Sequence, residues 1–589
     1  MPAPSLATHF QQFFLAPIEK SRDVRVVFWF WLSLLVALIY SLVALQEPLS
    51  SPYVIHDDVR SHVFWMHRFF DSSLFPKDLI TDYFQSVAPA GYVGLYRSMA
   101  ALGIDPFVFN KILPLPLVLI TVGYCFGLVM SLFPVPAAGF LASAFFTETI
   151  WSVNDVSSGT PRAFLYPLLM AFLYYAASRS LVPSLICIAL QGLFYPQCLF
   201  ISGGILLLRL IRWQEGRFAL SRDRSDYIFC GIGLGLVFLM LLPYALKISD
   251  YGPVATLPNA RSLPTLQHTS RKDFFHPNLW NYWVCNERSA LLPMEWCLEP
   301  FPPHGWLTIA LVPMLWLPSR FPLSRHVSNR AVILLQTVGA SIGMFVLAHA
   351  LLFRLHLPNR YTKHSFRIVI MIAGAIAFTI ALDALFRWVT RRWSRSMSLA
   401  AGGGMMLWIA VLLAYPWLIG GFINPDYVKA EPAALFTFFS EQPKDIVIAS
   451  LSEEGNNIPA ISKRAVLISS ETANPYHMGY YEQIWQRQQD VMLAHYSPAL
   501  RDVKSVVETY GIDFFLLDPE VFTPQYVGDD EWRRETQPFA TQAVERLEKG
   551  EASALEKLTP RCTVLEVDGM RVIDSTCILE SSSDSETKT

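Results

Sequence analysis

The sequence predicts an α-helical polytopic membrane protein with about eleven transmembrane helices, followed by a small α/β domain at the C-terminal end. Composition supports this fold class, because 53% of the 589 residues are apolar and only 16% are charged. A soluble protein needs more polar residues than this to cover its surface. Apolar runs of about 20 residues recur along the chain, and this length crosses a hydrocarbon layer of roughly 30 Å. Beyond Phe422 the pattern becomes polar and periodic, which predicts a separate soluble domain.

The apolar runs predict the transmembrane helices one by one. They cover residues 26–45, 112–132, 136–152, 163–178, 227–247, 331–353, 367–386 and 399–421. The stretch 182–211 is interrupted by Tyr195-Pro196 and predicts two short helices, and 306–318 predicts a short span rich in Trp and Leu. The first run is long and no small-residue cleavage pattern follows it, so we expect an anchor and not a cleaved signal peptide.

The distribution of Arg and Lys predicts the orientation, because positively charged loops stay on the cytoplasmic side. Basic residues precede the first span and gather in 209–224, 320–330 and 387–395, which share one side if eleven helices are threaded in order. We therefore expect a multi-pass protein of the inner (plasma) membrane with a cytoplasmic N-terminus and an extracytoplasmic C-terminal domain. The expected regions are a transmembrane domain 1–423 with outer loops 46–111, 249–305 and 354–366, an α/β domain 424–580, and a disordered tail 581–589.

Within the C-terminal domain, short apolar runs alternate with amphipathic segments, which favours a layered sheet with helices packed against it. The expected strands are 445–450, 465–469 and 513–518, the expected helices are 477–495 and 500–510, and a terminal hairpin turns at Asp568-Gly569.

Cysteine usage agrees with this threading. Half of the eight cysteines lie in or beside predicted helices, and the others form two natural pairs in segments assigned to the outer side, Cys285 with Cys297 and Cys562 with Cys577. An oxidising compartment favours two disulfides. Free thiols at these positions are the alternative, because the sequence does not fix their geometry.

An acidic pair, Asp57 and Asp58, directly follows the first span and lies between His56 and Arg60. A carboxylate at the membrane surface suits removal of a proton from an acceptor hydroxyl. It also suits binding of a divalent cation through oxygen, for which we consider Asp58. The alternative is that one of these carboxylates only caps the amphipathic helix expected to follow.

A basic loop precedes the span at 367–386 and is expected outside, against the positive-inside trend. Binding of an anion such as a lipid phosphate headgroup would explain this, since Arg clamps phosphate oxygens through paired donors. The alternative is a helix count wrong by one, which makes this an ordinary cytoplasmic loop. Its candidate binding residues are Arg354, Arg360, Tyr361, Lys363, His364 and Arg367.

Two further polar segments are candidates for ligand contacts. Arg162 follows Pro161 at the expected first turn of a helix, where anions are favoured, although Asn154 and Asp155 in the same stretch can simply build a turn. His477 and Tyr481 lie in an aromatic and acidic stretch that suits sugar contacts. A surface loop or a domain-docking patch is the alternative for that stretch.

Several classes of protein are disfavoured. The formal net charge of −2 gives no reason to expect nucleic acid as a partner. The sequence contains no Walker loop, no paired-Cys zinc motif and no Gly-x-Ser-x-Gly elbow. Acids within the predicted spans are few, chiefly Glu148 and Asp383, which weakens a proton or ion relay.

The arrangement resembles the GT-C superfamily of membrane glycosyltransferases over nearly the whole chain. The resemblance rests on the acidic pair in the first outer loop, the basic outer loop from Arg354 to Arg367, and a C-terminal extracytoplasmic domain after about eleven helices. The segment with His477 and the Tyr510 to Asp518 stretch also resemble the tails of bacterial members. The Trp-Trp-Asp pattern of oligosaccharyltransferases is absent, which disfavours protein N-glycosylation.

This resemblance implies transfer of a sugar, with inversion, from a polyprenyl-phosphate donor to an envelope glycan, lipid or protein acceptor at the outer face. Asp57 or Asp58 would act as the general base, and Arg360, Lys363 and Arg367 with Arg162 would neutralise the phosphate leaving group. No cofactor is required if Arg and Lys supply the charge, and a divalent cation (Mg or Mn) is the alternative. The competing functions are a transporter or flippase of a lipid-linked saccharide and an inactive GT-C-like scaffold.

Overall fold

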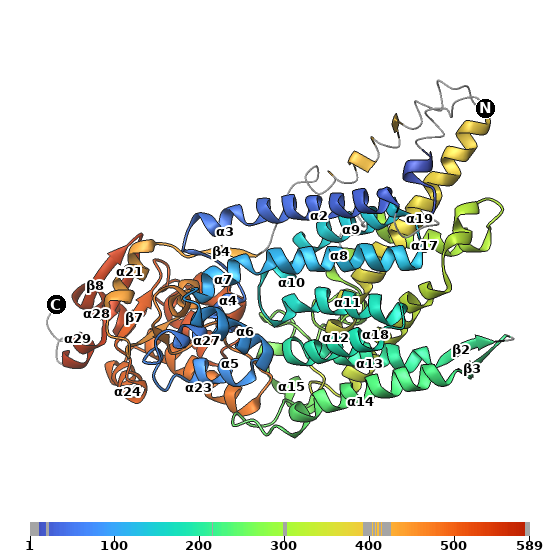
Figure 1. Ribbon diagram of the computed structural model, residues 1–589. Helices are drawn as coiled ribbons and strands as arrows, with labels where there is room; N and C mark the ends of the chain where they lie inside the picture. Colours follow the sequence, from blue (N-terminus) through green and yellow to red (C-terminus); the bar gives the residue numbers. More distant parts are fainter. Residues whose placement is uncertain are drawn as a thin grey trace.

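The computed structural model describes residues 11–18, 23–214, 216–297, 303–392 and 426–582, with scattered residues between 403 and 414. Figure 1 shows a bundle of long helices with the C-terminal sheet region packed on one end of it. One hydrophobic cluster runs through both regions, since it includes Phe146 of the bundle together with Ile448 and Tyr480 of the C-terminal region. The two regions therefore share a core at their junction.

The helices of the bundle follow the predicted spans. Helices α12 and α13 are separated at Tyr195-Pro196, as predicted, and α8 and α9 both begin at a proline, which suits the first turn of a helix. The span predicted at 399–421 lies largely outside the described residues. The bundle helices are α2 (Val24–Ala44), α8 (Pro114–Leu132), α9 (Pro136–Trp151), α11 (Leu165–Ala177), α12 (Leu181–Phe194), α13 (Gln197–Arg209), α14 (Arg224–Leu246), α17 (Pro303–Trp316), α18 (Val332–Ala350) and α19 (Lys363–Arg392).

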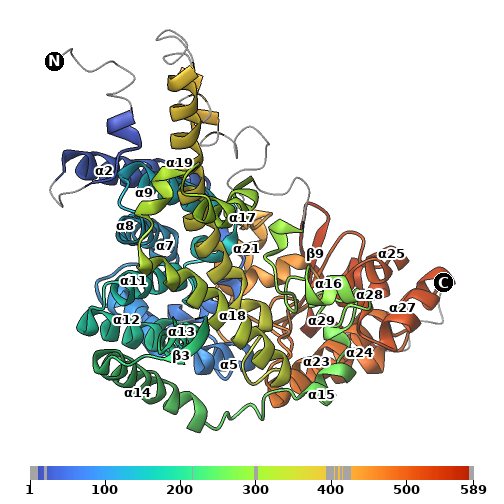
Figure 2. The same cartoon turned by 90° about the vertical axis from the view of Figure 1, so that its right-hand side faces the viewer.

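Among the described residues, five helices are long and apolar enough to cross a membrane. The helix that contains α19 is 83% buried in its most apolar window, whereas α14 is only 22% buried there. Figure 2 accordingly shows α14 along the edge of the bundle, whereas α19 passes through the bundle and extends beyond it at one end. Exposed Trp31, Leu35 and Phe238 lie on the peripheral helices α2 and α14. Such faces suit a hydrocarbon environment. The mostly helical fold with candidate membrane helices is confirmed, whereas the count of about eleven transmembrane helices stays a prediction.

The C-terminal region contains a five-stranded mixed sheet with the order β6-β5-β7-β9-β8. Strand β5 pairs in parallel with β6 and β7, and β9 pairs antiparallel with β7 and β8. The predicted strands and the terminal hairpin are confirmed. The strands are β5 (Val447–Ser450), β6 (Ala465–Val466), β7 (Phe514–Leu517), β8 (Thr563–Val567) and β9 (Met570–Asp574), and the flanking helices include α21 (Ala433–Glu441), α23 (Met478–Tyr496), α24 (Leu500–Tyr510), α27 (Phe539–Glu548) and α28 (Ala554–Cys562).

Two short strands connect distant segments of the chain. Strand β1 (Val54–His56), after the first bundle helix, pairs antiparallel with β4 (Tyr427–Lys429), at the start of the C-terminal region. The amphipathic helix expected after the acidic pair is broken, because α4 (Val59–His62) ends before the 3-10 helix η1 (Phe64–Phe69) begins. Beyond it, α5 (Leu79–Val87) places Tyr83 in a stack with Tyr480, with ring centroids 3.7 Å apart. The first loop is therefore held against the C-terminal region.

Both predicted disulfides are present, Cys285 with Cys297 and Cys562 with Cys577. The free cysteines of the described residues are all buried: Cys125, Cys187, Cys198 and Cys230. A hairpin that the sequence does not predict, β2 (Ile211–Gln214) with β3 (Arg217–Leu220), extends from the end of the bundle opposite to the C-terminal region (Figure 1).

Candidate active site

The acidic pair lies in the turn between β1 and α4, at the junction of the bundle with the C-terminal region. The N–H of Asp57 donates to the carbonyl oxygen of Asp426 at 3.0 Å, which continues the β1–β4 pairing. The N–H of Asp58 donates to Nδ1 of the buried His56 at 3.1 Å, and the Nε2 of His56 lies 3.3 Å from Ser157 Oγ. Backbone pairing and His56 together fix the direction of both carboxylates.

Asp57 belongs to a chain of alternating charges that reaches the C-terminal region. Arg60 forms ion pairs with Asp57 and, at 3.3 Å, with Glu471, which also pairs with Arg271. Burial and the negative charge of Glu471 raise the pKa of Asp57 to about 6, against the effect of Arg60. Burial also opposes ionisation of Glu471, but Arg271 and Arg60 hold its pKa below the ordinary value. Positive charge therefore compensates Asp57 less completely than it compensates Glu471.

Asp58 has a different environment, although it is the next residue. Its Oδ2 lies 2.6 Å from Nη2 of Arg162, which the 3-10 helix η2 (Pro161–Phe164) positions. Burial alone would raise the pKa of Asp58, but Arg162, the nearby histidines and Arg360 hold it below its ordinary value. Asp58 is thus an ionised group whose charge orients Arg162.

A third acid, Asp155 in α10 (Asn154–Ser157), is surrounded by the first residues of α19. Its Oδ2 lies 2.6 Å from Arg367 Nη1 and 3.2 Å from His364 Nδ1, and its Oδ1 lies 3.8 Å from Lys363 Nζ. It also accepts a hydrogen bond from Tyr166 at 3.1 Å. Despite the cost of burial, these basic groups hold the pKa of Asp155 well below its ordinary value. This network fixes α10 against the start of α19.

Basic groups without a direct ion pair among the described residues face the same region, and Glu287 lies near them. Arg360 in η7 (Pro358–Tyr361) and Arg288 form no ion pair within the described segments of the chain. The Nη1 atom of Arg360 is buried without a hydrogen-bond partner there. Burial lowers the pKa of His356 and raises that of Tyr476, and the charges of Arg360 and Arg288 act on both groups, so the two guanidinium groups lie near the same residues. Glu287 is one carboxylate near several cations, since Arg288, Lys363 and Arg360 lower its pKa. The remaining excess of positive charge suits an anionic ligand.

The structure brings together most of the residues proposed from the sequence. They are His56, Asp57, Asp58, Arg60, Arg162, Arg360, Lys363, His364 and Arg367. Residues from three distant segments of the chain therefore meet at this junction.

Four candidates contact neither the acidic pair nor Asp155 among the described residues. Arg354 is exposed. The hydroxyl of Tyr361 donates to the carbonyl oxygen of Leu355 at 2.7 Å, which stabilises its own loop. His477 lies 3.0 Å from the Tyr83 hydroxyl, and Tyr481 lies 2.9 Å from Thr265. The last two side chains connect the outer loops to α23.

Several members of the site are not indicated by the sequence. From the sequence, Asp155 is interpreted only as a turn residue. The one signal for a role in the site is its position between two predicted spans. Glu295, which binds Arg367 at 2.5 Å and 2.8 Å, lies close to Cys297 of the first disulfide and carries no signal of its own. Arg288, Arg271 and His62 are also missed, because their role in the site depends on contacts between distant loops.

The surroundings of Asp58 do not suit an oxygen-bound Mg or Mn ion. Its closest charged partner is Arg162, and the neighbouring Asp57 is paired with Arg60. Such ions prefer several carboxylate or carbonyl oxygens, whereas a guanidinium group here occupies the side that an ion would need. We therefore assign no chemical step to a metal at Asp58.

An apolar cavity of 680 Å³ lies away from these charges. It is formed between α2 and α8 and includes Phe30, Phe126 and Tyr174 in its lining. Its position among the predicted spans and its apolar lining do not suit acid–base chemistry.

No protein family model matches the chain, and no curated protein does. Solved structures do match. The oligosaccharyltransferase of Archaeoglobus fulgidus in its apo form aligns with 88% of this chain and 72% of its own, at 11% identity and a TM-score of 0.52. The archaeal oligosaccharyltransferase AglB from Archaeoglobus fulgidus, in complex with an inhibitory peptide and a dolichol-phosphate, aligns with 87% of this chain and 72% of its own, at 13% identity and a TM-score of 0.53.

The arabinofuranosyltransferase AftD from Mycobacteria also matches, over 86% of this chain and 36% of its own, at 12% identity and a TM-score of 0.45. All of these enzymes are GT-C glycosyltransferases. The two archaeal structures show that the present chain is similar to GT-C enzymes in fold across most of its length. The resemblance deduced from the sequence is confirmed at this level.

Proposed function

We propose that this chain is an inverting glycosyltransferase that moves a sugar from a polyprenyl-phosphate donor to an acceptor at the outer face of the membrane. The observation that carries the proposal is the convergence of Asp57 and Asp58 with Arg162 and Arg360 at one end of the helical bundle. A base and a group of cations at the membrane surface are the two components that this displacement needs.

Asp57 is the general base in this mechanism. Its pKa of about 6 lies closer to neutrality than that of an ordinary carboxyl, which improves proton transfer from a hydroxyl. The acceptor oxygen attacks the anomeric carbon while Asp57 takes the hydroxyl proton. The bond between that carbon and the phosphate oxygen breaks, and its electron pair leaves with the polyprenyl phosphate.

Arg360 and Arg288 neutralise the departing phosphate, together with Lys363. Two arguments support this role. Arg360 and Arg288 form no direct ion pair within the described residues, although Glu287 lies near both, and Lys363 lies at the longest of the ion-pair distances around Asp155, 3.8 Å. Arg367 is already held by Asp155 and Glu295, so its role is to anchor the start of α19. Cations in a water-poor site stabilise developing charge far more than they do in water.

Charge and disulfides also support an orientation in the membrane. The hairpin with Arg212 and Arg217 extends from the end of the bundle opposite to the acidic pair, which supports a cytoplasmic location for that end (Figure 1). The disulfides favour an oxidising compartment for the other end. We therefore propose a transmembrane domain of residues 1–423 and an extracytoplasmic domain of residues 424–580.

The test is transfer of radiolabelled sugar from polyprenyl-phosphate donors to cell-envelope acceptors in membranes that contain the native chain or a variant. We expect Asp57→Asn and Arg360→Ala each to lower the initial rate by about 100-fold, the scale of one acid–base or electrostatic group. Asp58→Asn tests the orientation of Arg162 and should give a smaller loss.

Matched controls are Asp445→Asn and Arg325→Ala, since both residues are exposed and remote from the site. Variants are compared at equal amounts of folded protein in the membrane. Unchanged transfer in Asp57→Asn and Arg360→Ala, or equal losses in the controls, would contradict the mechanism.

A further inference from the structure

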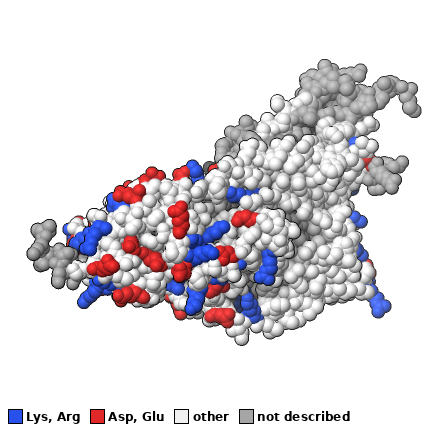
Figure 3. All heavy atoms as spheres, turned by 60° about the vertical axis from the view of Figure 1, so that its left-hand side comes forward, with Lys and Arg blue, Asp and Glu red and all other residues white. Residues whose placement is uncertain are grey.

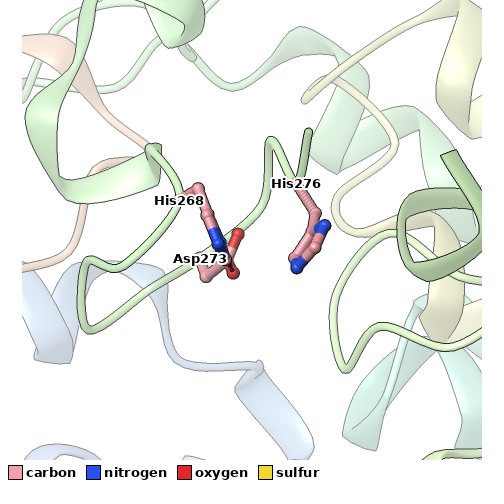
Figure 4. A group of neighbouring side chains, drawn as sticks. All are labelled: His268, Asp273 and His276. Atoms are coloured by element: carbon pink, nitrogen blue, oxygen red, sulfur yellow. Dashed lines mark hydrogen bonds and ion pairs between the residues drawn. The ribbon is translucent and has the colours of Figure 1, made fainter. Parts of the chain in front are cut away.

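The turn between η3 (Pro264–Leu266) and α16 (Leu279–Trp283) gathers three side chains that commonly bind metals. Figure 4 shows His268, Asp273 and His276 on neighbouring stretches of this turn. Each offers a ligand atom, and these atoms lie within 4.8 Å of one another. Within the described segments of the chain, this is the one group of three or more such residues with that spacing.

Local contacts already order the cluster. His268 Nδ1 lies 2.9 Å from Asp273 Oδ2, and the centroids of the His268 and His276 rings are 4.1 Å apart. The second carboxylate oxygen, Asp273 Oδ1, is buried without a hydrogen-bond partner in the described residues. A buried carboxylate oxygen without a partner is costly, and a bound cation would remove that cost.

We propose that His268, Asp273 and His276 bind a divalent ion of the zinc class. Two imidazole nitrogens and one carboxylate oxygen suit zinc, which also accepts a water as fourth ligand. Imidazole ligands select zinc, nickel, cobalt or copper, whereas magnesium and calcium prefer sites made of oxygen alone. The site differs in both position and ligand type from the acidic pair.

Binding exchanges one existing contact of His276. Its Nδ1 accepts the N–H of Asn278 at 3.0 Å, and its Nε2 lies 3.3 Å from the Asn281 amide. The ring is therefore held from both nitrogens, and the nitrogen that binds the ion gives up its contact. The remaining contact fixes the ring, as outer hydrogen bonds do for most metal-binding histidines.

The ion would fix the turn that carries Arg271 into the acidic site. Arg271 binds Glu471, which binds Arg60 beside Asp57. On its other side, the turn is tied to the C-terminal region, since Arg534 donates to the carbonyl oxygen of Thr269 at 3.0 Å. The zinc site is thus a positioning site for Arg271. Metal binding itself does not depend on the proposed transfer reaction.

The experiment uses the purified full chain in detergent, with any affinity tag removed and metals stripped by a chelator. Zinc chloride is titrated in a calorimeter, and the bound metal is counted by mass spectrometry after dialysis. We expect one zinc per chain, no displacement by a 100-fold excess of magnesium, and at least tenfold weaker binding in His268→Ala and His276→Ala. The matched control, His326→Ala, changes an exposed histidine in η5 (Pro322–His326) and should bind as the native chain does.

Cobalt binding to the native chain provides a readout that needs no variant. Visible absorption bands of a four- or five-coordinate cobalt site with nitrogen ligands would support the proposal, and bands of the hydrated ion alone would overturn it. Absence of zinc binding, or equal affinity in the His268 and His276 variants, would also overturn it.

Discussion

Asp57 and Asp58 are adjacent in the chain and have opposite electrostatic surroundings. Glu471 approaches the first from the C-terminal region, whereas Arg162 contacts the second from the loop between two bundle helices. The difference arises because successive side chains after a strand point in different directions. On the proposed function, two residues of one chemical type serve two tasks, proton transfer and orientation of a cation.

The raised pKa of Asp57 gives a prediction on pH. Transfer depends on the ionised carboxylate, so the rate should rise with pH and reach half of its maximum near the pKa of about 6. Sugar transfer measured between pH 4.5 and pH 7 checks this expectation. A profile that is flat across pH 6 would contradict the assignment of Asp57.

The same shift has a consequence for stability. Because Asp57 binds its proton more tightly in the folded state, it favours folding at low pH, and this contribution is lost as pH rises from the unfolded pKa of about 3.9 toward 6. Asp57→Asn should therefore flatten the dependence of unfolding temperature on pH over this interval. Activity and stability change in opposite directions at this residue.

At the scale of elements, α10 and the start of α19 are joined through one acid. Asp155→Asn removes one of the two carboxylates that balance Arg367 in a buried site, the other being Glu295. Because Glu295 still pairs with Arg367, the free energy of unfolding should fall by less than the roughly 3 kcal/mol of a fully broken buried pair. Unfolding of the purified chain in detergent, followed by circular dichroism, measures this loss.

The matched control for this prediction is Asp71→Asn. Asp71 pairs with Lys444 at 2.5 Å, but both side chains are exposed, and solvent screens such pairs. Its unfolding temperature should equal that of the native chain. If both variants behave alike, the buried network does not stabilise the junction.

The helices and strands differ in how well the sequence predicts them. The bundle helices follow from hydropathy and length, because lipid requires each span to satisfy its own backbone hydrogen bonds. The hairpin β2–β3 is missed, since its strands are too short to show alternation. The helix expected after Asp58 divides at Val63, where α4 ends and η1 begins, and the amphipathic pattern of the sequence does not reveal this break.

For the site, the sequence indicates Asp58, Arg162 and Arg360 from local patterns of charge and position. It does not indicate Glu471 or Glu295, because each acts through an ion pair with a residue far away in the chain. Such partners become visible only when the loops are placed in space. The same reason explains why the sequence groups Arg354 with Arg360 on one loop, although the side chain of Arg354 is exposed.

At the scale of the whole molecule, charged side chains are unevenly distributed. Figure 3 shows them gathered over the C-terminal end, whereas the face of the helical bundle in this view carries few. This is the pattern of a molecule with one end in water and the remainder in lipid. The proposed orientation places the charged end outside.

This orientation can be tested with single cysteines. Lys549→Cys lies at the exposed C-terminal end of α27, and Arg325→Cys lies in η5 before α18. We expect a membrane-impermeant maleimide to label Lys549→Cys in intact cells and Arg325→Cys only after permeabilisation. The native free cysteines that the structure describes are buried, which keeps the background low. Labelling of both from the same side would exclude the proposed threading.

The pairing of β1 with β4 sets an order on biosynthesis. Val54 pairs with Lys429, so the backbone that carries Asp57 gains its partner strand only after nearly all bundle helices have been made. A ribosome that has released only the first helices would expose the acidic turn without Asp426 or Glu471 beside it. On the proposed function, a nascent chain is therefore inactive until its C-terminal region has crossed the membrane, and truncated products cannot consume the lipid-linked donor.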